Sequence, residues 1–308
     1  MYYFIVNPNS RSGKGALIWK ELRRTLRQKH ISYKAVFTGY RGHAVKLAAS
    51  VTAKTTAEHP VYLIAVGGDG TIQEVLSGVK DLSCIYFGYI PTGSGNDFCR
   101  SMQLPQDPHE ALDCILKRKH IASMDVPVIS IKGRKSHFAI SCGIGFDAAV
   151  CHEVSVTPMK KILNRVGLGK LVYLFVALKQ LLFLKPVPVT LRMDEERIYP
   201  FHKVYFAAVM NQKYEGGGFK FCPDASPSDG YLDVIVVDGL SKLKVLFCLP
   251  TAFWGKHTQF TGIHIFRCKK VEVFSTVPLA VPKDGESAGI QETFSVSIEK
   301  EPVKIILP

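Results

Sequence analysis

The chain has 308 residues and a mass of 34.1 kDa, enough for about two domains of ~150 residues each. Its 47% hydrophobic and 21% charged residues exclude a disordered or fibrous protein. Because 39 Lys and Arg stand against 26 Asp and Glu, the net charge is +13. This charge predicts an anionic partner, which could be a phosphate ligand, a nucleic acid or an acidic lipid.

The cysteines and the apolar stretches bear on the compartment. The eight cysteines include no CxxC pair and lie mostly in apolar runs, which predicts buried free thiols in a reducing environment. Residues 1–8 lack the basic leader and cleavage site of a signal peptide. The most apolar stretch, residues 167–185, is interrupted by Lys170 and Lys179, so no transmembrane segment is predicted. We therefore expect a cytoplasmic protein.

Residues 1–124 alternate short β-rich runs with helical periodicity, which predicts an α/β domain with a Rossmann-like parallel sheet. Asp107, Pro108 and Glu110 have the spacing of a helix cap, a first helical residue and a capping box. The expected strands are 3–6, 33–38, 61–66 and 84–90, and the expected helices are 16–28, 43–52, 72–79 and one that opens at Asp107.

After residue 124 the chain changes to strands separated by turn residues, which predicts an antiparallel β-rich sandwich or barrel over residues 125–299. Residues 300–308 are expected to return to the first domain. The expected strands of the second domain are 126–131, 137–142, 187–193, 204–211, 231–237 and 270–274, with helices at 159–184 and 242–254.

The strongest local signal is a buried strand that runs into Gly67-Gly68-Asp69-Gly70-Thr71 and then into a helix. Glycines here leave backbone N–H groups unobstructed beside the positive end of the helix dipole, an arrangement that suits phosphate. The carboxylate of Asp69 would repel phosphate unless a cation lay between them, which indicates Mg²⁺ bound with a nucleotide. The alternative is a plain turn in which Asp69 caps the helix.

A second turn of similar construction, with Gly93, Ser94, Gly95 and Asn96, follows the next strand. Ligands of open α/β sheets bind beyond the carboxyl ends of the strands, so the two turns together predict a pocket. Asn7 ends the first strand and is expected on the same rim. Neither turn is a Walker A loop.

These motifs resemble the bacterial lipid kinases of the diacylglycerol kinase catalytic-domain family, and the resemblance covers almost the whole chain. The motifs that carry it are Gly-Gly-Asp-Gly-Thr at 67–71, Gly-Ser-Gly-Asn-Asp-Phe at 93–98, Gly-Ile-Gly-Phe-Asp-Ala at 143–148, Gly-Gly-Gly-Phe-Lys at 216–220, the run 223–233 and Asp-Gly-Glu at 284–286. The pentapeptide also occurs in soluble nicotinamide-nucleotide kinases, whereas the later motifs favour the lipid branch.

The resemblance implies a nucleotide-binding first domain and ATP-dependent phosphorylation of a lipid hydroxyl, with diacylglycerol as the leading substrate. It implies Glu286 as the general base and Asp69, Asp97 and Asp125 as acids that organise Mg²⁺ and bound water. Asp229, with the backbone carbonyls of Ser226 and Tyr231, matches a second, structural Mg²⁺ site. The residues implied to bind the nucleotide are Asn7, Thr38, Gly67, Gly68, Asp69, Gly70, Thr71, Glu74, Gly93, Ser94 and Asn96.

Without the resemblance, the later acids have simpler explanations. Asp284-Gly285 lies between strand-like runs and is first a hairpin signal, and the run 223–233 is a turn-rich loop whose acids could be solvated. A carboxylate at position 286 would nevertheless suffice to orient or accept the proton of an attacking hydroxyl. Pro282 departs from a regular strand because it removes a backbone donor close to Glu286.

The partners expected are a lipid substrate and an anionic membrane surface, with peripheral binding at the inner membrane face and no nucleic acid. Lys160, Lys161 and Arg165, followed by an apolar stretch, could lie in the membrane interface or could edge a core helix. Whether the protein forms a homodimer is left open. The alternatives are a kinase of a sphingoid base or another glycerolipid, a soluble nucleotide or sugar kinase, and a basic nucleic-acid-binding or lipid-binding protein without enzymatic activity.

Overall fold

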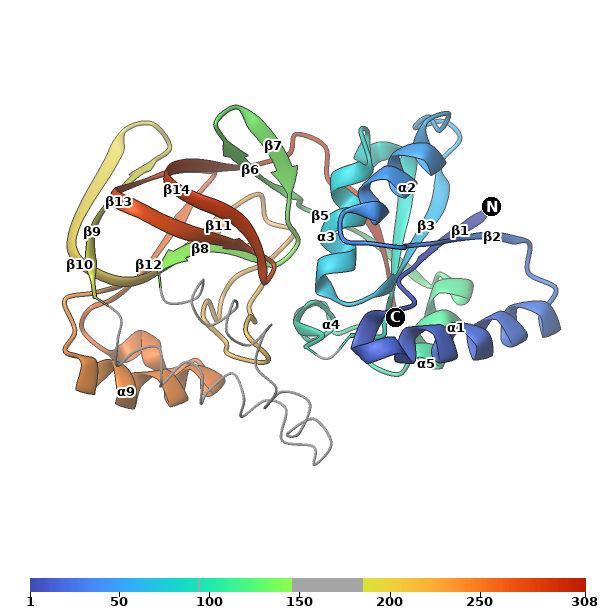
Figure 1. The fold of residues 1–308 in the computed structure, drawn as a ribbon, viewed down its shortest axis with the longest axis horizontal. Coiled ribbons are helices and arrows are strands. Elements are labelled where there is room, and N and C mark those ends of the chain that lie inside the picture. Colours follow the sequence, from blue (N-terminus) through green and yellow to red (C-terminus); the bar gives the residue numbers. More distant parts are fainter. Residues whose placement is uncertain (94, 146–184) are drawn as a thin grey trace. The chain divides into compact units, whose positions relative to one another are not determined.

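The computed structural model describes residues 1–93, 95–145 and 185–308 (Figure 1). The predicted helix at 159–184 lies outside these residues. The described chain divides into two compact units. Unit 1 comprises Met1–Val126, His137–Ala139 and Glu299–Pro308, and unit 2 comprises Pro127–Ser136 and Ile140–Ile298.

Unit 1 contains a six-stranded sheet, counted over the described residues, in the order β2-β1-β3-β4-β15-β5. Neighbouring strands pair in parallel except β15 and β5, which are antiparallel. The C-terminal strand β15 lies in this sheet between β4 and β5. The elements are β1 (Tyr2–Val6), α1 (Ser10–Gln28), β2 (Tyr33–Phe37), α2 (His43–Thr52), β3 (Val61–Gly67), α3 (Asp69–Gly78), η1 (Leu82–Cys84), β4 (Ile85–Pro91), α4 (Asp97–Ser101), α5 (Pro108–Lys117), β5 (His120–Met124) and β15 (Val303–Leu307).

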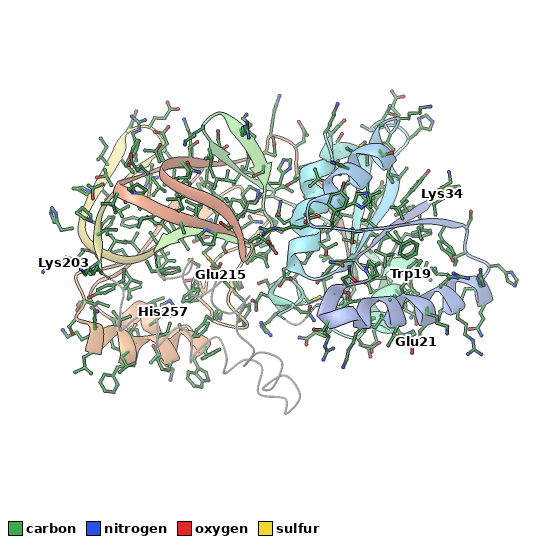
Figure 2. All side chains as sticks on the ribbon, in the orientation of Figure 1. Trp19, Glu21, Lys34, Lys203, Glu215 and His257 are labelled. Atoms are coloured by element: carbon green, nitrogen blue, oxygen red, sulfur yellow. The ribbon has the colours of Figure 1, made fainter. Side chains whose placement is uncertain are left out.

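The helices of unit 1 are positioned by apolar stripes and caps. Trp19, on the inner side of α1, packs among the aromatic rings of the sheet, whereas Glu21 points outward (Figure 2). The Asp107 carboxylate accepts the backbone N–H groups of His109 (2.9 Å) and Glu110 (3.1 Å), which confirms the predicted cap of α5. The sheet and the buried faces of α1 and α5 therefore form one core, and the parallel α/β prediction is confirmed.

Unit 2 is antiparallel and β-rich, also as predicted. The two long strands β10 and β13 both pair with β9 through their first halves and with β8 through their C-terminal ends. Because β9 and β8 each lie between the same two strands, the four strands form a closed ring. The described elements are β6 (Pro127–Ile131), β7 (Arg134–His137), β8 (Ser141–Gly145), β9 (Val187–Met193), β10 (Arg197–Met210), β11 (Leu232–Asp238), α9 (Lys242–Thr251), η2 (Ala252–Trp254), η3 (Lys256–Gln259), β12 (Ile263–Cys268), β13 (Lys270–Lys283) and β14 (Glu286–Ile298).

The expectation of one strand over residues 137–142 is wrong. β7 ends at His137 and β8 begins at Ser141. The backbone N–H groups of Ile140 and Ser141 donate to the carboxylate of Asp284 instead of to a neighbouring strand. The intervening residues 138–140 are all buried, so their apolar character gave no sign of the break.

The described cysteines are free thiols, most of them buried, which agrees with the cysteine prediction. Among the helices in the described ranges, none is long and apolar enough to cross a membrane.

Unit 2 contains a buried histidine whose titration bears on stability. His257 is 2% exposed and lies in the half of the unit that holds α9 (Figure 2), where it donates through Nε2 to the carbonyl of Phe221 at 2.9 Å. Burial lowers the pKa of His257 below its usual value, although the bond to Phe221 opposes this. The unfolded chain therefore takes up a proton at a higher pH than the folded chain does.

We expect the free energy of unfolding to fall as the pH drops below about 6.5, the ordinary histidine value. The variant His257→Gln keeps a donor for the carbonyl of Phe221 but cannot be charged, so its stability should depend less on pH in this window. Urea unfolding of both proteins between about pH 7.5 and about pH 5.5 measures the difference. Parallel curves for the two proteins would show that His257 does not contribute.

Candidate functional site

The candidate site of unit 1 lies at the carboxyl edge of its parallel strands. Because β1, β2, β3 and β4 run in one direction, the residues that follow them meet at the same edge. Backbone hydrogen bonds join these ends: Thr38 donates to Val6 (2.9 Å), and Asn7 donates to Val66 (2.8 Å). The predicted rim residue Asn7 thus lies next to the glycine turn that begins at Gly67, and Thr38 lies one strand further along the same edge.

The two glycine turns are in direct contact. The carbonyl of Gly67 accepts the backbone N–H groups of Thr92 (2.7 Å) and Gly93 (3.1 Å) and the hydroxyl of Tyr89 (3.1 Å). A Cβ placed on Gly93 would lie 2.7 Å from the Cα of Gly68, closer than real Cβ contacts. Glycine at position 93 is therefore required for the two backbones to approach each other.

Asp69 begins α3 and links the two turns electrostatically. Its Oδ2 accepts the backbone N–H of Asp97 at 3.2 Å, and Asp97, which is buried, pairs with Arg100. Burial, and then the charge of Asp69, raises the pKa of the Cys99 thiol to about 12. The Asp69 side chain is half-buried and its Oδ1 is shielded from solvent, so the carboxylate attracts a cation more strongly than a fully exposed one would.

The amide and hydroxyl groups of the rim suit an oxygen-rich ligand. Asn7 donates through Nδ2 to the hydroxyl of Thr71 at 3.3 Å. Asn96 has a left-handed backbone (φ 53°), and its buried Oδ1 has no hydrogen-bond partner among the described residues. Oxygen donors of this kind, together with Asp69, are those that Mg²⁺ prefers, and the glycine backbone leaves room for phosphate. The residues present thus fit a nucleotide with its magnesium ion.

The remaining predicted residues of unit 1 are placed less directly. The carboxylate of Glu74 accepts the backbone N–H groups of Gly42 (2.7 Å) and Ala44 (3.1 Å), so it satisfies the start of α2. Asp125 is half-buried in the segment between β5 and β6. Ser94 lies outside the described residues. A nucleotide contact by Glu74 or a metal role for Asp125 stays a prediction.

In unit 2, Glu286 is held next to a tight turn. β13 and β14 are joined by Asp284 and Gly285, both with positive φ (48° and 77°), which is the backbone expected of an Asp-Gly hairpin. Glu286, half-buried, pairs in register with Lys283. A register shift between Ala280 and Pro282 absorbs the missing N–H of the proline.

The turn beside Glu286 is anchored by buried polar contacts that the sequence did not reveal. The carboxylate of Asp284 accepts the N–H groups of Ile140 (2.8 Å) and Ser141 (3.0 Å), and its own N–H donates to the carbonyl of Ser141 (2.9 Å). The hydroxyl of Ser141 donates to the buried carboxylate of Glu215. The nearest sequence signal was the Asp-Gly pair itself, which gives no information about partners so distant in the chain.

The predicted structural magnesium site lies in the loop before β11. Asp229 accepts the backbone N–H of Tyr231 (3.0 Å) and pairs with Arg267. Burial, and then the charges of Asp229 and Asp224, raises the pKa of Asp233 to about 6, against the opposing effect of Arg267. Within the described ranges, no group of three His, Cys, Asp or Glu is arranged to hold a metal ion. The metal role of Asp229, Ser226 and Tyr231 therefore stays a prediction.

The contact between the glycine turns can be tested by adding one methyl group. Gly93→Ala should raise the dissociation constant for ATP at least tenfold, because the new Cβ must displace the backbone of Gly68. Gly95→Ala in the same loop is the matched control, since its Cβ would meet no described atom closer than 3.4 Å. Calorimetric titration with ATP measures both variants. Equal affinities for the two variants would contradict the proposed role of the contact.

Comparison with known proteins agrees with this architecture. Residues 1–128 match the model of the diacylglycerol kinase catalytic domain, and residues 141–306 match that of the YegS C-terminal NAD kinase beta sandwich-like domain. YtlR of Bacillus subtilis, assigned as a lipid kinase, is 29% identical over 99% of this chain and 98% of its own. A diacylglycerol kinase of Mycobacterium tuberculosis is 30% identical over 86% of this chain and 82% of its own.

A crystal structure from Bacillus anthracis, assigned as a diacylglycerol kinase, has a TM-score of 0.76 at 23% identity and covers 100% of this chain and 97% of its own, which shows the shared fold. Taken with the two domain matches, these similarities establish that the chain belongs to the family of bacterial lipid kinases that combine a diacylglycerol kinase catalytic domain with a YegS-type C-terminal domain.

Proposed function

We propose that the protein transfers the γ-phosphoryl group of ATP to the hydroxyl of diacylglycerol, which forms phosphatidic acid and ADP. The observation that carries the proposal is the contact between the turns at Gly68 and Gly93, beside the carboxylate of Asp69. Diacylglycerol is favoured as acceptor because relatives that match most of the chain are named diacylglycerol kinase.

The chemistry asked of unit 1 is to hold and neutralise a triphosphate. Backbone N–H groups at the start of α3 point toward the carboxyl edge of the sheet, where the helix dipole favours phosphate. Neutral polar groups beside these N–H groups come from the side chains of Asn7, Thr71 and Asn96. Asp69 would hold a magnesium ion, which would supply the positive charge that neutralises the phosphates as charge develops on them. Asp97 and Asp125 are the further acids proposed to organise metal-bound water.

Glu286 of unit 2 is the proposed general base. Its carboxylate would accept the proton of the lipid hydroxyl as that oxygen attacks the γ-phosphorus, while the bond from the γ-phosphorus to the bridging oxygen breaks and ADP leaves. The hairpin that carries Glu286 is anchored through Asp284 to Ile140 and Ser141, which limits the movement of the carboxylate. A fixed position is what a group of this kind needs.

A second magnesium ion is proposed to bind Asp229 with the carbonyls of Ser226 and Tyr231, where it would replace the ion pair of Asp229 with Arg267. The proposed place of action is the cytoplasmic side of the inner membrane, reached as a peripheral protein. The basic net charge of +13 supports attraction to acidic lipid.

The experiment that tests the function offers the protein ATP labelled in its γ-phosphate together with a total-lipid extract, and identifies the labelled product by mass. Labelled phosphatidic acid, formed only with Mg²⁺, is the expected result. A labelled sphingoid base or another labelled glycerolipid would change the acceptor but keep the lipid kinase. Label in members of a panel of sugars and nucleosides, with none in lipid, would contradict the proposal.

A further inference from the structure

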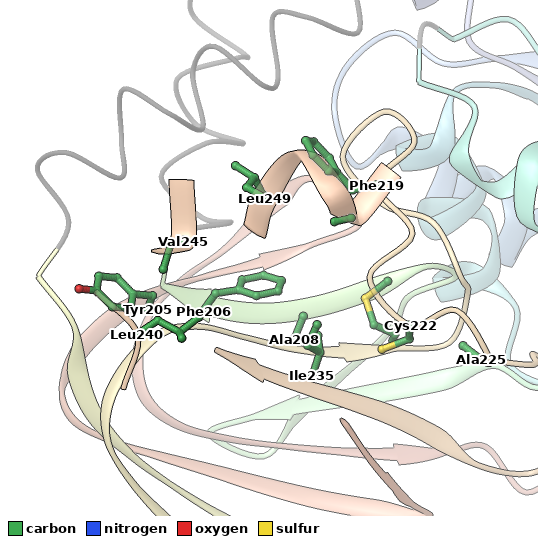
Figure 3. Packing of buried hydrophobic residues seen from close by; sticks show 12 residues of the cluster. Tyr205, Phe206, Ala208, Phe219, Cys222, Ala225, Ile235, Leu240, Val245 and Leu249 are labelled. Atoms are coloured by element: carbon green, nitrogen blue, oxygen red, sulfur yellow. The ribbon is translucent and has the colours of Figure 1, made fainter. Parts of the chain in front are cut away.

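Helix α9 of unit 2 has apolar side chains on two opposite faces. Its inner face, which includes Val245 and Leu249, packs on the buried cluster around Phe206 and Ile235 (Figure 3). The opposite face carries Leu243 and Phe247, one helical turn apart, with exposed fractions of 62% and 66%. A helix that covers a core ordinarily has polar residues on its outer face. Packing on the core of unit 2 therefore does not explain why Leu243 and Phe247 are apolar.

Further exposed apolar side chains follow directly after the helix in the chain. Trp254, at the end of η2, is 70% exposed, and Phe260 shortly after it is also exposed. Large aromatic and aliphatic side chains exposed within one short segment are typical of surfaces that contact another molecule or a membrane. We call Leu243, Phe247 and Trp254 the apolar ridge.

Cations flank the apolar ridge. Lys242 and Lys244 are exposed, and at about 100° per residue they lie on either side of the line through Leu243 and Phe247. Lys256 is exposed two residues after Trp254. No Asp or Glu occurs between Asp238 and Glu272, so this stretch has only positive formal charge. Apolar side chains with lysines on both sides are the pattern of a helix that lies in a membrane interface.

The positive charge also distinguishes between two molecules that could cover this face, a second copy of the chain and an anionic bilayer. A symmetric dimer through this face would bring lysines of one copy against the same lysines of the other, and no acidic residue of the stretch would compensate them. An anionic bilayer supplies the opposite charge and an apolar layer below it.

We propose that α9 and η2 form a docking face that lies on an anionic lipid bilayer, with the apolar ridge inserted at the level of the headgroups and Lys242, Lys244 and Lys256 on acidic lipids. Because the inner face of α9 is packed on the core, the ridge is presented by a rigid element. The physiological purpose of the docking, access to a membrane-resident acceptor, rests on the proposed function.

The experiment measures binding of the full chain to two kinds of vesicle, phosphatidylcholine alone and phosphatidylcholine with phosphatidylglycerol. The ridge variant is Leu243→Gln, Phe247→Gln and Trp254→Gln combined. The matched control is Ile198→Gln with Ile290→Gln, because these two side chains of the same unit are equally exposed (62% and 67%) but lie on other elements. Thermal unfolding of each variant checks that it is folded.

We expect the wild-type protein to float with anionic vesicles and the ridge variant to bind at least tenfold more weakly, while the control binds like the wild type. Lys244→Gln with Lys256→Gln should weaken binding about fivefold per lysine, with less effect at high salt. Unchanged binding of the ridge variant, or equal binding of the wild type to neutral vesicles, would overturn the proposal.

Sedimentation of the wild type and the ridge variant without vesicles tests whether a second copy of the chain covers this face. A wild-type dimer that the ridge variant abolishes would assign the face to a second copy and overturn the membrane proposal. Activity on diacylglycerol dispersed in detergent micelles separates this inference from the proposed function. If the protein phosphorylates diacylglycerol in micelles but the ridge substitutions do not affect vesicle binding, only the proposed docking face is wrong. If the protein phosphorylates no acceptor, the proposed function is refuted, and the vesicle-binding result still stands.

Discussion

Replacing Glu286 with Gln is expected to lower kcat by about 10²- to 10⁴-fold, the range typical for the loss of a general base, with little change in the affinity for ATP. The amide cannot accept the proton of the acceptor hydroxyl, yet it has the same shape, and the hairpin remains anchored through Asp284. Steady-state rates with diacylglycerol in detergent micelles, together with calorimetric titration of ATP, measure the two quantities separately.

The matched control for this variant is Glu292→Gln, which makes the same chemical change at an exposed position of the same strand, β14. It should have the kcat of the wild type. If both variants were equally active, Glu286 would not be the base, and the role implied by the Asp-Gly-Glu motif would have to be abandoned.

Replacing Asp69 with Asn is expected to lower kcat by about 10²- to 10³-fold and to raise the Mg²⁺ concentration required for half-maximal rate. The neutral side chain can still accept the N–H of Asp97, so the turn should keep its shape. What is lost is the negative charge of a half-buried carboxylate whose Oδ1 is shielded from solvent, which attracts a cation more strongly than an exposed one.

Rates measured over a range of Mg²⁺ concentrations test this prediction, with Asp113→Asn as the control because Asp113 is a half-exposed acid of the same unit that pairs with Lys29. A reduced rate with an unchanged Mg²⁺ requirement would assign Asp69 a positioning role without a metal. A rate like that of the control would remove Asp69 from the site.

The elements of unit 1 were largely predictable because their ends carry local signals. α2 begins and ends where the helical periodicity indicated. The start of α1 was not predictable to the residue, because Arg11, Ser12 and Gly13 adopt positive φ inside the segment. Local sequence carries little information about such a departure from helical geometry.

Unit 2 was less predictable because its strands are defined by pairing with distant segments. β10 and β13 extend well beyond their apolar runs, because each strand pairs first with β9 and then, further along, with β8. β12 was missed altogether, although residues 263–268 alternate in the manner of a strand. Register and strand exchange depend on tertiary contacts that a single sequence does not encode locally.

In the candidate site, too, features set by local sequence were predictable, and features set by distant contacts were not. The two glycine turns were identified from sequence because backbone freedom at a strand end is a local requirement. The partners of Glu74 and Asp229 were not, since Glu74 bonds to Gly42 and Ala44 and Asp229 pairs with Arg267, all far away in the chain. Sequence motifs thus predicted the candidate site residues, and the structure added which of their carboxylates have protein partners.

Hydrogen exchange of backbone amides, with and without a non-hydrolysable ATP analogue and Mg²⁺, tests the central claim most directly, because it reports on both glycine turns at once. We predict that binding slows exchange at Gly68–Thr71 and at Gly93–Asn96 together, and that Gly93→Ala reduces the protection of both turns. Protection confined to one turn, or located away from the carboxyl edge of the sheet, would contradict the claim that the two turns jointly bind the phosphates.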